Sequence, residues 1–322
     1  MKISVVVPTC LRDDLLLRCL DALATQHMSA SDYEILVVDD GHSRTTRDLV
    51  ERAARETSGP ALRYMEPPRG LHGPAAARNT GWRAARGEII AFTHDDTIPA
   101  PCWLREGSQA MDPDIGAAWG PVPESSSDAP AEATTGIDES QRAEFSTANC
   151  FVRRRALTDI DGFDERFKVA GREDADLYFT LLEHGFEVVH APQAQVHQVV
   201  RDVPFGASLK KQRNMLFEAL LFKKHPALYR SKISSRPPLR YYLAVFALFA
   251  GFELLLLREP RAAMTAFAIW LGCTLVLAFF RWQRTSHAPR RVLEMLITSA
   301  AIPLLAVVWR IAGAFRFRVI FA

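Results

Sequence analysis

Residues 73–96 have the sequence GPAAARNTGWRAARGEIIAFTHDD, and this stretch decides the fold. Its first part, Pro74–Arg86, is rich in Ala and predicts a helix, which Gly87 can end in the left-handed conformation. Glu88–Thr93 is a short apolar run that predicts a buried strand, and it leads directly into the residues HDD at 94–96. A helix followed by a strand that ends in carboxylates is typical of a parallel α/β sheet with a polar site at its edge.

The same alternation extends in both directions from this stretch. Upstream, apolar β-branched runs alternate with segments of helical spacing, and downstream a further strand and helix follow. We therefore predict an α/β fold with a mostly parallel central sheet flanked by helices. The predicted strands are Ile3–Pro8, Tyr33–Val38, Leu62–Met65 and Phe145–Val152, and the predicted helices are Asp13–Gln26, Arg44–Thr57 and Glu173–His184. Pro121–Gln141 has no apolar period and is predicted to be a mobile loop.

Polar clusters follow three of the predicted strands. These are Pro8-Thr9 after the first, Asp39-Asp40 after the second, and the HDD sequence at 94–96. Ligands of such sheets bind beyond the carboxyl ends of the strands, so the clusters predict a binding site there. Each cluster alone is equally consistent with a turn or a helix cap. Their joint occurrence at one sheet edge favours the site.

A second acidic pair, Glu173-Asp174, opens a predicted helix. A carboxylate near a helix N-terminus is stabilised as the anion, which suits a general base, although ordinary capping explains the pair equally well. Paired carboxylates such as Asp95-Asp96 are hard oxygen ligands that hold Mg²⁺ or Mn²⁺ next to phosphates.

Charge is distributed unevenly along the 322 residues. The segment from Tyr241 onward has nine Arg, no Lys or Asp and three Glu, a net charge of +6, whereas the preceding 240 residues carry −4. An acidic front part argues against a nucleic-acid partner, because phosphate contacts need clustered cations. The five cysteines form no CxxC pair, so neither a zinc site nor a disulfide framework is expected.

The C-terminal part contains three long apolar segments, at 241–257, 262–280 and 292–309. A membrane-spanning helix needs about 20 apolar residues, so these segments predict hydrophobic membrane helices in contact with lipids. The expected domains are 1–205, a catalytic domain; 206–240, a basic helical connector; and 241–322, a membrane-associated helical region. The expected location is a cell membrane with the first domain in the cytoplasm. Three Arg beyond the third segment fit that orientation if this segment is interfacial and broken near Pro303.

The sequence resembles the inverting glycosyltransferases of family 2. The resemblance rests on VVVPTCLRDDLLLRCLDAL, EILVVDDG, GPAAARNTGWRAARGEIIAFTHDD with IPAPCWL, TANCFVRRRAL, DGFDERF and GREDADLYFTLLEHG, which together span about residues 2–200. The family implies the nucleotide-sugar-binding GT-A fold and a divalent metal, Mn²⁺ or Mg²⁺. It also implies a nucleotide-sugar donor, with UDP the commonest carrier. With the apolar tail, it implies hexosyl transfer to a lipid-linked or glycan acceptor.

The resemblance assigns roles position by position. It implies that Asp174, with Glu173, supplies the catalytic base. The residues implied in nucleotide-sugar binding are Pro8, Thr9, Asp39, Asp40, Arg78, Asn79 and Asp95, and those implied in metal binding are Asp96 and His197. A lone His is as often structural as functional, so His197 is equally consistent with both roles.

One residue departs from the family pattern. His94 stands where relatives usually have a third acidic residue, which leaves the identity of the metal open because imidazole ligates Mn²⁺ more readily than Mg²⁺. A non-catalytic membrane scaffold that kept the fold is the alternative. A nucleotidyltransferase or a dinucleotide-dependent dehydrogenase would need a Gly-rich loop after the first strand, and PTCLRDD contains no glycine.

Overall fold

A computed structural model of the chain describes residues 1–56, 59–123, 145–199, 204–283 and 288–321. The described residues form two compact units. The first contains those of Met1–Ser125 and Ala143–Val200, and the second contains those of Arg201–Ala322. The predicted loop Pro121–Gln141 falls almost entirely outside the described residues.

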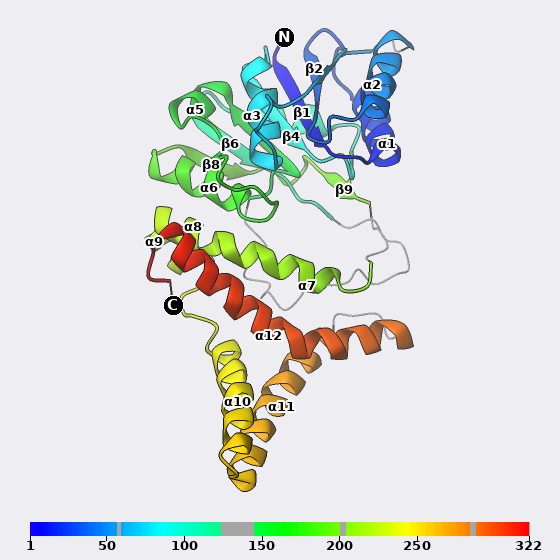
Figure 1. Ribbon diagram of the computed structural model, residues 1–322. Coiled ribbons are helices and arrows are strands. Elements are labelled where there is room, and N and C mark those ends of the chain that lie inside the picture. The colour runs from blue at the N-terminus through cyan, green and yellow to red at the C-terminus, as the bar shows by residue number, and fades with distance from the viewer. Residues whose placement is uncertain (57–58, 124–144, 200–203, 284–287, 322) are drawn as a thin grey trace. The chain divides into compact units, whose positions relative to one another are not determined.

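A seven-stranded sheet forms the centre of the first unit (Figure 1). The strand order is β3-β2-β1-β4-β7-β6-β8, and only β7 runs antiparallel to its neighbours, β4 and β6. The predicted mostly parallel α/β sheet is therefore confirmed. The strands are β1 (Ile3–Thr9), β2 (Tyr33–Asp39), β3 (Ala61–Met65), β4 (Ile89–Thr93), β6 (Ile115–Trp119), β7 (Asn149–Arg153) and β8 (Glu187–His190).

Helices cover both faces of this sheet, and the alternation along β1 shows why. Val5 and Val7 contribute to one core with the first, second and fourth helices, whereas Val6 contributes to the opposite core with the third, fifth and sixth. Because successive strand residues point to opposite faces, the largely apolar β1 is buried on both. The helices are α1 (Asp13–Ala24), α2 (Arg44–Glu56), α3 (Pro74–Ala84), α4 (Trp103–Gln109), α5 (Arg154–Asp159) and α6 (Glu173–Glu183).

The prediction that Gly87 ends α3 in the left-handed conformation was wrong. Gly87 does not have the positive φ of a left-handed cap, and the helix ends earlier, at Ala84, with Ala85 in an extended conformation. Gly87 is instead needed for space, because a Cβ at this position would lie 2.6 Å from Ile3 C and from Ser4 N in β1. The glycine thus lets the chain enter β4 in close contact with its neighbouring strand.

The strand order reverses direction between β1 and β4. The chain builds outward from β1 through β2 to β3 and then returns to add β4 on the other side of β1. In open parallel sheets this switch point is where the loops diverge and ligands bind. The residues beyond β1 and β4 are therefore the ones that the topology directs to a common site.

A small second sheet extends the loop that leaves β4. Its strands, β5 (Thr97–Pro99) and β9 (Val196–Gln198), are antiparallel, and Ile98 is opposite His197. Asp96 O also accepts a hydrogen bond from Val199 N over 2.9 Å. Strand β9 and Val199 therefore hold one side of the loop that contains the HDD sequence at 94–96.

The second unit is helical. It begins with α7 (Ala207–Lys211), the 3₁₀ turn η2 (Gln212–Asn214), α8 (Met215–Lys224) and α9 (Pro226–Lys232). A hairpin of α10 (Leu239–Leu256) and α11 (Pro260–Trp282) follows, and then the long α12 (Pro289–Phe317). Gly251 allows the hairpin to pack closely, because a Cβ there would lie 2.7 Å from the Phe267 ring.

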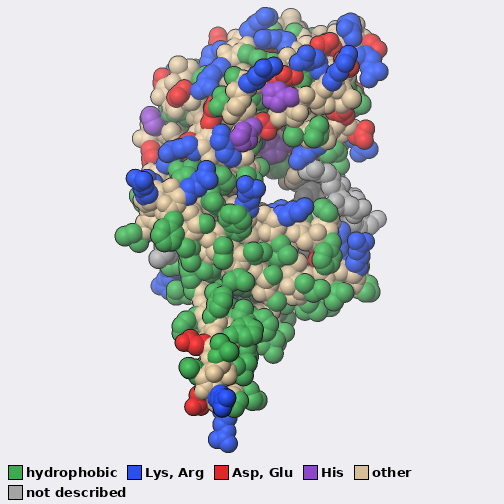
Figure 2. Space-filling model, in the orientation of Figure 1, with side chains coloured by type: hydrophobic (Ala, Val, Ile, Leu, Met, Phe, Trp, Pro, Cys, Tyr) green, Lys and Arg blue, Asp and Glu red, His purple; other side chains and the backbone are tan. Residues whose placement is uncertain are grey.

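Helices α10, α11 and α12 are each long and apolar enough to cross a membrane. Figure 2 shows hydrophobic side chains gathered over the hairpin and charged side chains at its tip, where Arg258 and Glu259 join the two helices. Helix α12 is more deeply buried than the hairpin and packs on α8. It continues through Pro303, whereas we expected the segment to be broken near this residue.

Candidate active site

The Asp95 carboxylate joins the ends of β1 and β4. Thr9, the last residue of β1, donates from Oγ1 to Asp95 Oδ2 over 2.9 Å, and Arg12 Nη1 donates to Oδ1 over 3.0 Å. Burial raises the pKa of Asp95, while Arg12 and Thr9 lower it. Both carboxylate oxygens of Asp95 accept hydrogen bonds, so this residue links the end of β1 to the loop that follows β4.

The next carboxylate, Asp96, is buried between a cation and an imidazole. Its Oδ2 lies 3.7 Å from Arg12 Nη1 and its Oδ1 lies 3.8 Å from His94 Nδ1. Both distances are long for an ion pair. Asp96 is therefore surrounded by positively polarised groups without a short contact to either of them.

The two carboxylates after β2 are held by backbone amides. Asp39 is fully buried and accepts hydrogen bonds from Gly41 N, Ser43 N and the Tyr64 hydroxyl, over 2.7 to 3.0 Å. Asp40 accepts from Gly73 N at the start of α3, and its own amide donates to Thr9 O over 2.9 Å. This second strand end is thereby tied to both β1 and α3.

Arg78 connects the loop after β4 to α6. It is 2% exposed, its Nη1 donates to Glu173 Oε1 over 3.2 Å, and its Nη2 lies 2.9 Å from His94 Nε2. An arginine can only donate, so His94 Nε2 must accept, and the neutral ring carries its proton on Nδ1. That proton faces Asp96.

The pair Glu173-Asp174 divides into a buried and a more accessible carboxylate. Glu173 Oε2 accepts from the amides of Gly171 and Arg172, which hold it at the helix N-terminus. Asp174 is partly exposed and accepts from Thr147, from its hydroxyl over 2.6 Å and its amide over 3.1 Å. Thr147 Oγ1 in turn lies 3.4 Å from His94 Nε2, so His94 lies between the two acidic pairs.

Two pKa shifts follow from this arrangement. Burial lowers the pKa of His94 well below its ordinary value, and the charge of Arg78 lowers it further, although Asp174 and Asp96 act in the opposite direction. Burial raises the pKa of Glu173, and the charge of Asp174 adds to this, while Arg78 and the backbone amides lower it. His94 is consequently neutral at neutral pH.

The remaining predicted site residues lie around this network. Pro8 is the partly buried residue before Thr9, in register with Val38 of β2. His197 is exposed on β9. Asn79 has both side-chain polar atoms bonded within the chain: Oδ1 accepts from Trp82 and Phe163, and Nδ2 donates to Phe163 O and Glu165. For these and the other predicted site residues, the donor and metal contacts stay predictions.

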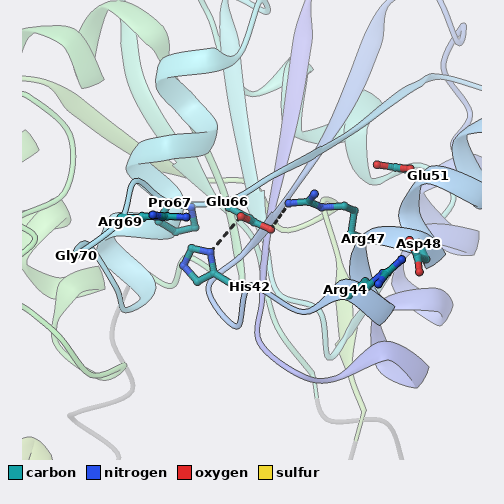
Figure 3. A pocket seen from close by; sticks show the side chains of 9 residues that line it. All are labelled: His42, Arg44, Arg47, Asp48, Glu51, Glu66, Pro67, Arg69 and Gly70. Atoms are coloured by element: carbon teal, nitrogen blue, oxygen red, sulfur yellow. Dashed lines mark hydrogen bonds and ion pairs between the residues drawn. The ribbon is translucent and has the colours of Figure 1, made fainter.

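A cavity of about 890 Å³ lies beside the end of β2 (Figure 3). Glu66 is central to its lining and is held by Arg47 Nη2 over 2.6 Å, by His42 Nδ1 over 3.2 Å and by the Tyr64 hydroxyl. These hydrogen bonds lower the pKa of Glu66 to about 2. The single Tyr64 hydroxyl lies within hydrogen-bond distance of both Glu66 and Asp39, so the cavity wall is connected to the buried carboxylate of β2.

Carboxylate and imidazole donors for a divalent metal are present but few. Among the described residues, no group of three or more His, Cys, Asp or Glu side chains could hold a metal ion. Asp96, flanked by His94, is the best donor in this part of the chain. The site therefore fits a metal that takes most of its ligands from phosphate and water, as Mg²⁺ commonly does.

Residue-level reasoning missed two contributors to this network, Arg12 and Thr147. Arg12 lies in the LRDD sequence after β1, and Thr147 lies in TANC before β7. Both sequences had been noted as parts of family motifs, but neither residue type carries a chemical signal by itself. Only the hydrogen bonds to Asp95 and Asp174 identify them.

Two family models match the chain. The model described as glycosyl transferase family 2 matches residues 4–161, and the model described as glycosyl transferase family group 2 matches residues 133–311. The second match alone covers more than half of the chain.

Curated relatives are distant and mostly longer. The poly(ribitol-phosphate) beta-glucosyltransferase of Bacillus spizizenii is 36% identical over 106 residues, 33% of this chain but only 16% of that protein. Glycosyltransferase AglE of Haloferax volcanii is 27% identical over 222 residues, 65% of this chain and 70% of that protein.

Among solved structures, the mannosyltransferase PcManGT from Pyrobaculum calidifontis, in complex with GDP-Man and Mn²⁺, is similar with a TM-score of 0.55. It is 21% identical, and the match covers 98% of this chain and 85% of that chain. At this identity the similarity shows the fold, which is the GT-A type expected from the sequence.

Proposed function

The chain belongs to glycosyl transferase family 2, and from this premise we propose that it transfers a hexose from a nucleotide-sugar donor to a lipid-linked or glycan acceptor at a membrane, with inversion. One observation carries the proposal. His94 lies between Asp96, Arg78 and Thr147, and Thr147 holds Asp174, so the two acidic pairs meet around one imidazole. Such a meeting of groups is what a single displacement requires.

Asp174 is the proposed base. It is the more accessible member of its pair, and Thr147 fixes its orientation from two atoms. Asp174 would take the proton of an acceptor hydroxyl as the acceptor oxygen bonds to the anomeric carbon and the bond from that carbon to the diphosphate breaks. Attack from the face opposite the nucleotide inverts the configuration.

The donor is proposed to bind at the switch point between β1 and β4. Pro8, Thr9 and Asp39 line the nucleoside end, with Asp40 holding the start of α3 in place. Asp95 keeps the two strand ends together, and Arg78 adds a buried positive charge near the departing diphosphate. Asn79 and His197 complete the proposed site, the first buried on α3 and the second exposed on β9.

Asp96 is proposed to hold a divalent cation, Mn²⁺ or Mg²⁺, with His197 as a further ligand. When bound, such a cation stabilises negative charge on the leaving diphosphate. His94 and Arg12 lie on either side of this buried carboxylate at 3.8 and 3.7 Å. The Mn²⁺ and GDP-Man bound to the mannosyltransferase neighbour support this choice of cation and of donor class.

The apolar hairpin is proposed to anchor the enzyme in a cell membrane, with the first unit in the cytoplasm. At about 1.5 Å per residue, α10 and α11 are about 27 and 35 Å long, which matches a hydrocarbon core of about 30 Å. Their surfaces expose large apolar side chains such as Phe246, Phe249 and Met264. A membrane-bound location supports an acceptor that is itself lipid-linked.

A donor screen tests the proposal. Purified full-length protein in detergent is incubated with labelled UDP-, GDP- and dTDP-sugars, with Mn²⁺ or Mg²⁺, and membrane lipid extract as the acceptor source. We expect one donor to be consumed, only with metal, and an anomeric proton of inverted configuration in the product by NMR. Failure to transfer or hydrolyse any donor would instead favour the non-catalytic scaffold.

A further inference from the structure

The second unit contains a buried guanidinium that makes no hydrogen bond or ion pair with any part of the chain that the structure describes. It belongs to Arg310 on α12, which is 6% exposed. Its Nε is buried and has no hydrogen-bond partner. Arg310 also differs from Arg281 and Arg291 of the same unit, which have acceptors on α12.

An anion stabilises a guanidinium whose Nε is buried without a partner. Arginine keeps its positive charge in proteins, and its planar fork of N–H groups suits an oxyanion. The only partner of the Arg310 guanidinium among the described residues is the Phe321 ring, whose centroid lies 4.0 Å from Cζ. A ring face attracts the charge but accepts none of the five N–H hydrogen bonds.

The neighbouring residues increase the positive potential. Phe321 packs on Phe222 and Tyr229, with ring centroids 5.2 and 5.6 Å away. Arg230 lies over Phe222 at 5.3 Å, and Lys223 Nζ donates to Phe317 O over 2.8 Å. Three cations therefore surround one aromatic cluster.

The nearby carboxylate does not neutralise this group. Glu218 of α8 is buried and accepts a hydrogen bond from the Tyr229 hydroxyl over 2.7 Å. Among the described residues, no carboxylate lies within ion-pair distance of Arg310. The described residues therefore provide no carboxylate that pairs with this positive charge.

The same end of α12 also exposes an apolar surface. Ile311 directly follows Arg310, and Phe315 and Ile320 lie beyond it, exposed by 47%, 80% and 94%. An anion attached to a hydrocarbon chain satisfies both features, because the chain covers the apolar side chains while the anion meets the guanidinium.

We propose that Arg310, supported on the Phe321 ring, binds the phosphate group of a membrane lipid. Arg matches phosphate oxygens with paired N–H groups, which explains an arginine at this position. Either a glycerophospholipid or a polyprenyl phosphate presents the required group.

Native mass spectrometry of the full-length protein tests the proposal. Delipidated protein in a phosphate-free detergent is mixed with dioleoylphosphatidylglycerol, with a polyprenyl phosphate, or with dioleoylglycerol, which has no phosphate. We expect the wild type to retain one molecule of a phosphate lipid and to release dioleoylglycerol. Arg310→Gln is expected to lower the retained fraction at least tenfold.

Arg316→Gln is the matched control. It removes the same charge from the same helix, but Arg316 is exposed, so retention should stay within twofold of the wild type. Whichever phosphate lipid is retained identifies the source. Equal retention by Arg310→Gln and the wild type, or wild-type retention no greater than that of dioleoylglycerol, overturns the proposal.

If Arg310→Gln does not fold, Phe321→Leu replaces it. This change leaves the guanidinium in place but removes its aromatic support, and retention should fall at least threefold. The comparison of phosphate lipid with dioleoylglycerol in the wild type needs no variant at all. Because lipid retention is measured without a sugar donor, its failure is distinguishable from failure of glycosyl transfer.

Discussion

The two acidic pairs of the first unit, Asp95-Asp96 and Glu173-Asp174, each consist of two carboxylates, but their surroundings differ. In each pair the first carboxylate is locked to the scaffold, Asp95 by Thr9 and Arg12, and Glu173 by Arg78 and two backbone amides. The second carboxylates differ. Asp96 is buried, whereas Asp174 is partly exposed.

This difference separates the chemistry that each pair can perform. A buried carboxylate is a hard oxygen ligand that suits a bound cation, and a partly exposed one, oriented by a threonine, suits proton transfer with an incoming hydroxyl. The first residue of each pair then serves mainly to position the second. Three predictions test this division, and a fourth uses a carboxylate outside both pairs as a reference.

The largest expected effect is that of Asp174→Asn. The amide keeps a similar shape but cannot accept a proton, so transfer should fall by about 10²–10⁴-fold. Binding of the nucleotide sugar should change little, because Asp174 is not in the donor half of the proposed site. Labelled-donor transfer and calorimetric titration measure the two quantities.

Glu187→Gln on β8 is the matched control for this variant, since it neutralises an exposed carboxylate of the same unit outside the network. It should transfer at the wild-type rate. Turnover of Asp174→Asn equal to that of the control would remove the base assignment and, with it, the proposed difference between the pairs.

Glu173→Gln should mainly affect stability. It leaves the buried Arg78 without its carboxylate partner, and breaking a buried ion pair costs about 3–5 kcal/mol. The melting temperature in detergent should therefore fall clearly, whereas Asp174→Asn should melt near the wild type. If both variants melt at the same temperature, Glu173 is not the structural member of its pair.

Asp96→Ala should abolish the metal dependence of donor binding. We expect calorimetric affinity for the donor in Mn²⁺ to fall about 10- to 100-fold, to the value measured with EDTA. Asp95→Asn is the informative comparison, because its contacts are to Thr9 and Arg12 and it should retain a response to Mn²⁺. A normal Mn²⁺ response in Asp96→Ala would exclude this residue as a ligand.

The smallest effect concerns Glu66, a carboxylate outside both pairs. Its pKa is lowered from 4.5 to about 2 in the folded protein, so its stabilising contribution is present above pH 4.5 and is lost as the pH falls toward 2. Because the side chain is partly exposed, Glu66→Gln should cost only about 0.5–1 kcal/mol at pH 7.

Thermal melts from pH 3 to 7 measure this contribution. The difference between the wild type and Glu66→Gln should shrink as the pH falls. If the difference in melting temperature does not change with pH, the ionised form of Glu66 contributes nothing to stability. Another carboxylate would then have to serve as the reference for the two acidic pairs.

Much of the first unit could be predicted from local patterns. The apolar run at Ile3–Pro8 and the helical spacing of Leu16, Leu20 and Leu23 correspond to β1 and α1. The strand at Glu88–Thr93 is confirmed within one residue. These features are readable because alternation and helical period act over neighbouring residues.

The sequence did not predict that β7 runs antiparallel to its neighbours. It also did not predict why a glycine is needed at position 87. Strand direction depends on how the chain returns after β6, and the need for a glycine depends on how closely β1 approaches. Both are contacts between residues far apart in sequence.

From the sequence alone, the α/β class and the apolar character of the C-terminal helices could be predicted, because composition and short-range periodicity carry these properties. The family was predicted from the resemblance of several sequence motifs to glycosyltransferase family 2. Only the tertiary structure decided which carboxylate of each pair is locked and which is left for chemistry. It also decided that Arg310 is buried with no hydrogen-bond partner for its Nε among the described residues. These outcomes depend on burial and on hydrogen bonds across 80 or more residues, as between Thr9 and Asp95, and no local pattern encodes them.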